Sequence, residues 1–133
     1  MDCIFCKIAK GEISSNKVYE DESVFAFLDI NPVSAGHTLV IPKKHYENIY
    51  DIPEEILEKI TIVAKRLVLI YRDKFEIESV NILNSNGSAA QQDVFHYHMH
   101  IIPRKKGDGT IFKWESKKVD FDKFLEKLGE VKI

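Results

Sequence analysis

The sequence predicts an α+β fold whose sheet is largely antiparallel. Three observations support this prediction: apolar strand patterns open the chain, one long segment with a 3.6-residue apolar period follows, and strand patterns return after it. The 133 residues match the length of one compact domain, and they contain no internal repeat, low-complexity tract or long linker. We therefore expect a single domain over residues 1–133.

Three strands are predicted before the helix. Residues 18–19 and 24–28 flank the polar segment 20–23, which is typical of a hairpin, and the apolar run 24–28 indicates that its second strand is mostly buried. After a turn, the β-branched segment 37–41 forms the third strand. We expect that strand to stop at Pro42, because proline has no backbone N–H to donate to a sheet.

Residues 54–74 are predicted to form the one long helix. Acidic residues near its start and basic residues near its end complement the helix dipole. Its core-facing side is defined by Ile56, Ile60, Val63, Leu67 and Tyr71. Further apolar residues lie outside that face, where a lone domain would expose them to water: Ile62, Leu69 and Ile70. A symmetric homodimer would cover them.

Two more strands and a short helix complete the predicted elements. Residues 80–83 form the fourth strand, residues 84–88 a loop, and residues 95–102 the fifth strand, which we expect Pro103 to close. A glycine-rich turn follows at residues 107–109. A short helix near the C-terminus is indicated by Phe121, Phe124, Leu125 and Leu128.

The composition is that of a soluble globular protein. Hydrophobic residues make up 44% and charged residues 30% of the chain, which excludes a disordered or collagen-like protein. The net charge of −2 argues against a nucleic-acid partner. No apolar run reaches the roughly 18 residues that span a bilayer, and the N-terminus lacks the pattern of a signal peptide. We therefore expect a cytoplasmic protein with no membrane partner.

Cys3 and Cys6 are the two cysteines of the chain, and their spacing has two interpretations. In a reducing compartment, a Cys-x-x-Cys pair indicates half of a metal site more than a structural disulfide. The alternative is a redox-active pair. That alternative is disfavoured because no strand precedes the pair to build a thioredoxin-like unit.

Three histidines alternate with apolar residues in the predicted fifth strand. Side chains at alternate positions share one face of a strand, so His96, His98 and His100 line up together while the apolar residues between them face the core. Three imidazoles on an otherwise apolar strand have no evident packing role, which indicates a functional face. Spacing alone leaves open whether they perform chemistry themselves or chelate one metal ion together.

The segment 96–102 resembles the signature of the histidine triad (HIT) family, in which three histidines alternate with hydrophobic residues. The segments 3–8, 27–30, 36–45 and 92–95 fit the same family in the same order, so the resemblance covers residues 3 to about 104. The chain looks most like bacterial-type members of the branch related to nucleoside phosphoramidases. This resemblance implies a HIT-like fold with a five-stranded antiparallel sheet, one long helix and short terminal helices, usually paired into a homodimer.

The resemblance also implies an enzyme that hydrolyses or transfers nucleotides. The expected substrates are nucleoside 5′-phosphoramidates or related acyl- and phospho-nucleotides of a purine, such as derivatives of AMP or GMP, cleaved through a covalent histidine–nucleotide intermediate. His98 matches the family's nucleophile, His100 matches the histidine that binds a phosphate oxygen, and His37 matches a histidine that supports the triad from a neighbouring strand. A neutral imidazole is nucleophilic near pH 7, as this chemistry requires.

Further positions match the family's substrate pocket. Asp29 matches the acid that accepts the ribose hydroxyls, while Gln92 and the loop residue Asn86 match the region that contacts phosphate and ribose. The positions that match residues packing near the base are Phe5, Ile8, Ile30 and Leu39.

We also expect one structural zinc ion, because two thiolates and two imidazoles complete a tetrahedral site: Cys3, Cys6, His45 and His96. Other functions stay open at this point. They are a dinucleoside polyphosphate hydrolase, as in the fragile histidine triad branch, a nucleotide-binding scaffold whose catalysis is vestigial, and a metal-dependent hydrolase.

Overall fold

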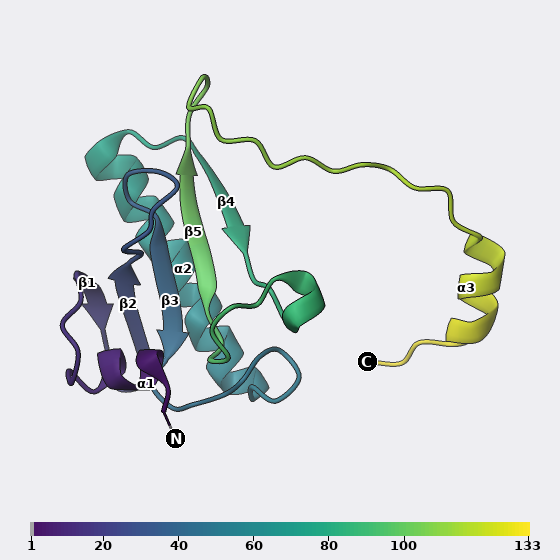
Figure 1. The fold of residues 1–133 in the computed structure, drawn as a ribbon, viewed down its shortest axis with the longest axis horizontal. Coiled ribbons are helices and arrows are strands. Elements are labelled where there is room, and N and C mark those ends of the chain that lie inside the picture. Colours follow the sequence, from purple (N-terminus) through teal and green to yellow (C-terminus); the bar gives the residue numbers. More distant parts are fainter. Residues whose placement is uncertain (1) are drawn as a thin grey trace.

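The computed structural model describes residues 2–133. Its centre is a five-stranded sheet of order β1-β2-β3-β5-β4, in which every neighbouring pair is antiparallel, so the predicted α+β class is confirmed (Figure 1). The strands are β1 (Lys17–Glu20), β2 (Val24–Leu28), β3 (Thr38–Pro42), β4 (Ser79–Leu83) and β5 (Met99–Arg104). The helices are α1 (Ile4–Ala9), α2 (Glu54–Phe75), the short 3-10 helix η1 (Ser88–Ala90) and α3 (Phe121–Leu128).

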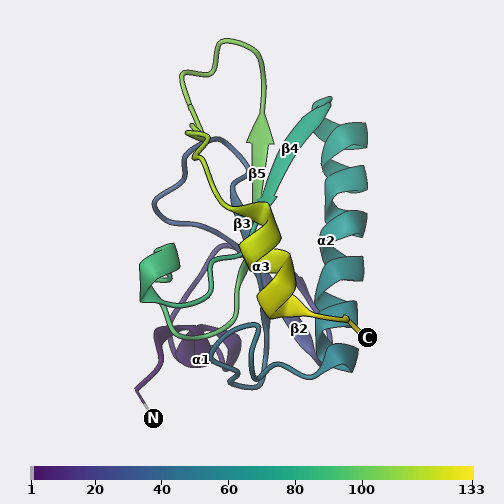
Figure 2. The same ribbon diagram turned by 90° about the vertical axis from the view of Figure 1, so that its right-hand side faces the viewer.

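The two faces of the sheet are covered differently. The long helix α2 lies along one face, and α1 lies on the opposite side of the strands (Figure 2). Because strand side chains alternate, each face has its own apolar core. The core on the α2 side includes Val24, Ala26, Val40, Ile60, Ala64, Leu67, Tyr71, Tyr97, Met99 and Ile101. The core on the α1 side consists of Cys3, Phe5, Ile8, Phe25, Phe27, Leu39 and Ile41.

The long helix agrees with the prediction to within one residue. Pro53 precedes its first turn in an extended conformation, and Glu76 ends the helix with a left-handed backbone (φ 56°) whose N–H donates to the Arg72 carbonyl. The apolar residues off its core-facing side are 50%, 38% and 43% exposed: Ile62, Leu69 and Ile70. The described chain therefore leaves an apolar strip of α2 facing water.

The fifth strand begins later than predicted. It starts at Met99, so His100 is the one triad histidine within the sheet. The segment before it bends away because the Tyr97 N–H donates to the carbonyl of Tyr46, outside the sheet, over 2.7 Å. The alternation survives this bend: Tyr97 packs in the core on the α2 side, whereas the imidazole of His98 packs against Phe5 on the other side.

Prolines lie at or near the ends of two strands. β3 ends at Pro42, as the sequence predicts, whereas β5 continues one residue past Pro103, to Arg104. The pairing between β3 and β5 covers only residues 38–40 and 99–101, so both prolines lie where a strand has lost one of its neighbours. A missing N–H disturbs few sheet hydrogen bonds at such a position.

The C-terminal segment stands away from the sheet. An extended stretch leads from β5 to α3, which is the predicted short helix (Figure 1). Its apolar side chains are all exposed: Phe121, Phe124, Leu125 and Leu128. None of the helices in residues 2–133 combines the length and the apolar character that a membrane span requires.

Candidate active site and metal cluster

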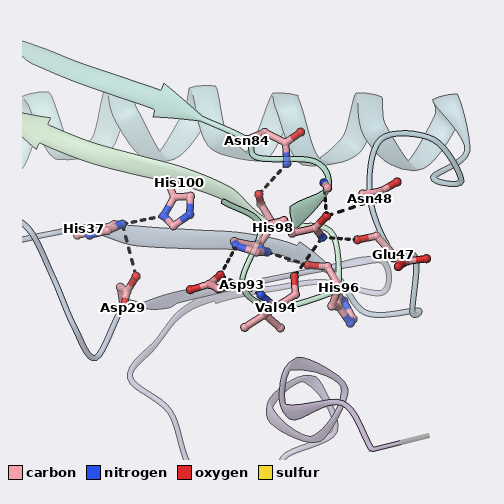
Figure 3. A network of polar contacts seen from close by, with 12 residues as sticks. Asp29, His37, Glu47, Asn48, Asn84, Asp93, Val94, His96, His98 and His100 are labelled. Carbon is pink, nitrogen blue, oxygen red and sulfur yellow. Dashed lines mark hydrogen bonds and ion pairs between the residues drawn. The ribbon is translucent and has the colours of Figure 1, made fainter. Parts of the chain in front are cut away.

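His98 has a buried imidazole, one nitrogen of which is hydrogen-bonded to the backbone. Its side chain is 3% exposed, and its Nδ1 lies 2.8 Å from the carbonyl oxygen of His96 (Figure 3). Since a carbonyl can only accept, Nδ1 carries the hydrogen and donates it. The lone pair of the neutral ring is therefore on Nε2, which is the atom available for attack on an electrophile.

The backbone and the ring of His98 are both held in place. Asn84, at the end of β4, donates from Nδ2 to the His98 carbonyl over 2.9 Å (Figure 3). The Phe5 ring lies edge-on to the imidazole, with 5.2 Å between the ring centroids. The sequence groups Asn84 with a substrate-contacting loop, but the structure uses its amide to position the His98 backbone.

A chain of hydrogen bonds orients His100. The Val33 N–H donates to His37 Nδ1 over 3.1 Å, so the hydrogen of the neutral His37 ring must be on Nε2. That nitrogen lies 2.9 Å from His100 Nδ1 and donates to it (Figure 3). His100 is thereby left with its own N–H on Nε2, ready to donate to an anionic oxygen.

Burial keeps the imidazoles of His37 and His100 neutral. It lowers the pKa of His100 to about 4, with further lowering from the neighbouring His98 and His37. Burial also lowers the pKa of His37, although the nearby Asp29 carboxylate acts in the opposite direction. The donor and acceptor pattern above is therefore the one that prevails at neutral pH.

Asp29, His37 and His100 place three ligand atoms within 4.8 Å of one another, which is close enough for a metal ion. The hydrogen-bond pattern argues against that use. A metal on His37 Nε2 would require the hydrogen to move to Nδ1, where it would face the Val33 N–H. We therefore interpret this group as an ordered hydrogen-bond chain, with Asp29 Oδ2 3.5 Å from His37 Nε2.

The four predicted metal ligands do lie together at the start of α1. Cys3 Sγ is 3.4 Å and Cys6 Sγ is 3.5 Å from His96 Nδ1, and Cys6 Sγ is 3.4 Å from His45 Nδ1. Tetrahedral Zn²⁺ with ordinary bond lengths separates its sulfur and nitrogen ligands by about 3.5 Å. The spacing of these atoms therefore suits a zinc ion.

The protonation of the cluster also suits a metal. His96 Nε2 lies 2.8 Å from the Pro42 carbonyl and donates to it, which leaves Nδ1 as the ligating nitrogen, and burial lowers the His96 pKa to about 4. Burial and the neighbouring Cys3 raise the pKa of Cys6 to about 11. Two adjacent thiolates, one buried and one partly buried, need a cation beside them, and Zn²⁺ would supply it.

The other predicted pocket residues differ from one another in burial and in hydrogen bonding. Phe5, Ile8 and Leu39 are buried in the core on the α1 side, where Leu39 pairs with His100 across β3 and β5. Ile30 is 79% exposed. Asn86 is bound within the protein, since its Oδ1 accepts from the Ile49 N–H over 2.7 Å.

Gln92 has no free polar atom for a ligand. Its Oε1 accepts from the Gly87 N–H and from Asn48 Nδ2, and its Nε2 donates to the carbonyls of Glu47 and Val94. These four bonds tie together three segments beside the histidines. The side chain therefore holds the loop in shape, which differs from the substrate contact that the sequence suggests for it.

Comparisons with known proteins show the family to which the chain belongs. The HIT domain model matches residues 10–107. The Hit protein of Bacillus subtilis is 52% identical over 121 residues, which are 90% of this chain and 83% of the relative. Adenosine 5′-monophosphoramidase HNT1 of Saccharomyces cerevisiae is 43% identical over 122 residues, which are 91% of this chain and 75% of the relative.

Solved structures share the fold. A crystal structure of a HIT family member from Bacillus subtilis has a TM-score of 0.81 at 52% identity, covering 88% of this chain and 84% of that one. A zinc-bound histidine triad family protein from Mycobacterium smegmatis has a TM-score of 0.80 at 38% identity, covering 88% and 85%. The family model spans most of the sequence and includes all three triad histidines, and so the chain belongs to the HIT family.

Proposed function

We propose that this protein cleaves nucleoside 5′-phosphoramidates, or related acyl- and phospho-nucleotides of a purine, through a covalent nucleotide on His98. The observation that carries the proposal is the state of the His98 ring, whose Nδ1–H is bound to the His96 carbonyl while Nε2 keeps its lone pair. The yeast relative named above is a phosphoramidase, which supports the same substrate class.

The chemistry divides one displacement into two. His98 Nε2 attacks the α-phosphorus and the leaving group departs; water then attacks the phosphorus and releases the nucleoside monophosphate. The Nδ1 bond to the His96 carbonyl keeps the ring aligned in both steps. Because the ring is already oriented before substrate binds, little rearrangement precedes attack.

His100 would stabilise the charge that builds on the phosphate. Its Nε2–H is a donor fixed in advance by the chain through His37 to the Val33 N–H. We propose that Asp29 receives the ribose hydroxyls: its Oδ1 accepts one backbone bond, from Asn31, and keeps further lone pairs free. The exposed Ile30 side chain would pack on the base beside it, with Phe5, Ile8 and Leu39 as the apolar floor beneath.

The experiment is to replace His98 with alanine and to assay hydrolysis of adenosine 5′-monophosphoramidate. We expect turnover to fall at least 1,000-fold, on the order seen when a nucleophile is removed, while AMP still binds. The wild-type protein should also carry an acid-labile nucleotide on His98 when trapped during turnover. A label on His100, or full activity in the His98→Ala variant, would overturn the mechanism.

Two alternatives predict different substrates or none. A dinucleoside polyphosphate hydrolase would prefer diadenosine polyphosphates over the phosphoramidate in the same assay. A scaffold with vestigial catalysis would bind AMP without turning over either compound. The free lone pair of His98 favours catalysis, because a binding module needs no oriented nucleophile.

We further propose that Cys3, Cys6, His45 and His96 hold one structural zinc ion. The ion would tie α1 to the loop before β5 and so fix His96, whose carbonyl orients His98. Its role would be structural, since all four ligand positions of a tetrahedral site are filled by the protein.

We also propose that two chains pair as a symmetric homodimer through the face that includes the apolar strip of α2. Ile62, Leu69 and Ile70 lie exposed there, and the outer edge of β4 has no partner strand within residues 2–133. A two-fold contact would cover the apolar residues and protect the edge strand at once.

A further inference from the structure

Asp93 lies next to the attacking atom of the proposed nucleophile. Its Oδ1 is 3.8 Å from His98 Nε2 (Figure 3). The same oxygen accepts a 2.9 Å hydrogen bond from the Val94 N–H, so the carboxylate is held in this orientation by the backbone. In the sequence, Asp93 is an ordinary acid in a loop, and only its distance to His98 in the structure marks it.

The carboxylate borders the approach to Nε2 from solvent. His98 itself is 3% exposed, and its ring is closed in by Phe5 and His100, whose ring centroids lie 5.2 and 5.1 Å away. The side chain of Asp93, by contrast, is 84% exposed. Asp93 is therefore a solvent-facing acid beside the atom that would bond to phosphorus.

A cleft of about 580 Å³ continues outward from Asp93 and is acidic. Asp2 and Lys7 on its wall neutralise each other in a 2.8 Å ion pair. The other two acids of the wall, Glu47 and Asp93, form no ion pair with lysine or arginine in the part of the chain that the structure describes. The charged side chains of the cleft that Asp93 lines therefore carry net negative charge.

We propose that Asp93 determines leaving-group specificity and selects nucleoside phosphoramidates of basic amines over substrates with anionic leaving groups. This inference rests on the proposed function. In the first step a bond forms between His98 Nε2 and phosphorus, and the phosphorus–nitrogen bond breaks. Its electron pair departs on the amine nitrogen, which solvent has protonated beforehand, so a neutral amine leaves. The carboxylate stabilises the positive charge on that nitrogen and on any ammonium group that the amine carries into the cleft.

The second step returns the enzyme to its starting state. Water attacks the phosphorus, the bond to Nε2 breaks with its electron pair returning to the imidazole, and the proton of the water passes to solvent. A sulfate, carboxylate or polyphosphate leaving group would instead bring negative charge against Asp93 and Glu47. Such substrates are disfavoured by like-charge repulsion in partly desolvated surroundings.

The test uses two AMP phosphoramidates with the same phosphorus–nitrogen bond, one made with ethylenediamine and one with β-alanine. Their tails end in an ammonium and a carboxylate, respectively. The variant is Asp93→Asn, which removes the charge but keeps an oxygen for the Val94 N–H. The matched control is Glu58→Gln, which removes one exposed acid from α2, the helix on the other face of the sheet.

We expect the ratio of kcat/KM for the cationic over the anionic substrate to fall about 10-fold in Asp93→Asn, the order expected when one nearby charge is removed. The ratio should not change in Glu58→Gln. An Asp93→Asn ratio within twofold of wild type, or an equal change in the control, overturns the role of Asp93. Absence of wild-type turnover with both compounds refutes the proposed function instead. In that case, the ratio of the dissociation constants of the two compounds is measured by calorimetry in the same three proteins. A ratio in Asp93→Asn within twofold of wild type, or an equal change in the control, again overturns the role of Asp93.

Discussion

Replacing His37 with alanine tests whether the hydrogen-bond chain behind His100 matters for turnover. The substitution removes the acceptor of the Val33 N–H and the donor to His100 Nδ1 at once. His100 stays in place, but either of its nitrogens can then carry the hydrogen. Part of the protein would present a lone pair to the phosphate where the wild type presents an N–H.

The expected loss follows from these contacts. Removing a preorganised donor outright costs about 100- to 1,000-fold in kcat, and here the donor is misoriented but still present, so we expect about 10- to 100-fold. KM should change less than threefold, because in the proposed mechanism His37 acts on the phosphate only through His100. The Val33 N–H and His100 Nδ1 lose their partners, which should lower the free energy of unfolding by about 1–3 kcal/mol.

The assay is steady-state hydrolysis of adenosine 5′-monophosphoramidate, with thermal unfolding as a check on folding. His37→Gln is the matched variant, because its amide offers an acceptor to Val33 and a donor to His100. It should recover most of the activity lost in His37→Ala. A His37→Ala enzyme within threefold of wild-type kcat, or a glutamine variant no better than the alanine variant, would refute the proposed role of the chain.

Three further measurements test the other conclusions. Metal analysis of the metal-replete wild type should find one zinc ion per chain, and the variant Cys3→Ser/Cys6→Ser should hold less than about a tenth of a zinc ion per chain. The melting temperature of that variant should be several degrees lower than that of the wild type, because the structural zinc is lost. A metal-free wild type of equal stability would exclude the site. Sedimentation at micromolar concentration should give twice the 15.4 kDa chain mass, and Ile62→Glu/Leu69→Glu should shift it toward the monomer; a monomeric wild type contradicts the dimer. Because burial lowers the pKa of His100 to about 4, the unfolded chain binds a proton there at higher pH than the folded one, so the free energy of unfolding should fall by about 3 kcal/mol between pH 6.5 and pH 4. That decrease should be smaller in His100→Asn, and an equal decrease in both proteins would show that His100 is not the group responsible.

Much of the fold could be predicted from local patterns in the sequence. The 3.6-residue period of residues 54–74 specifies an amphipathic helix, and α2 covers residues 54–75. Short apolar runs bounded by turn residues identify the strands, because alternation and turn chemistry act within a few residues. The predicted start of the fifth strand was wrong, because a contact between residues far apart in the sequence determines it. The backbone hydrogen bond from Tyr97 to Tyr46 takes the chain out of the sheet before Met99.

The site shows the same division between local and long-range information. Alternation in the sequence identifies three histidines on one side, but it treats them alike. The tertiary structure separates their roles. His96 contacts Cys3 and Cys6, which lie 93 and 90 positions away along the chain. His98 has a free Nε2, and His100 accepts a hydrogen bond from His37 in a neighbouring segment. The roles of Asn84, Gln92 and Asp93 likewise depend on distances across loops. A hydrogen bond or a charge acts over a few ångströms in space, and only the folded chain determines which residues come that close.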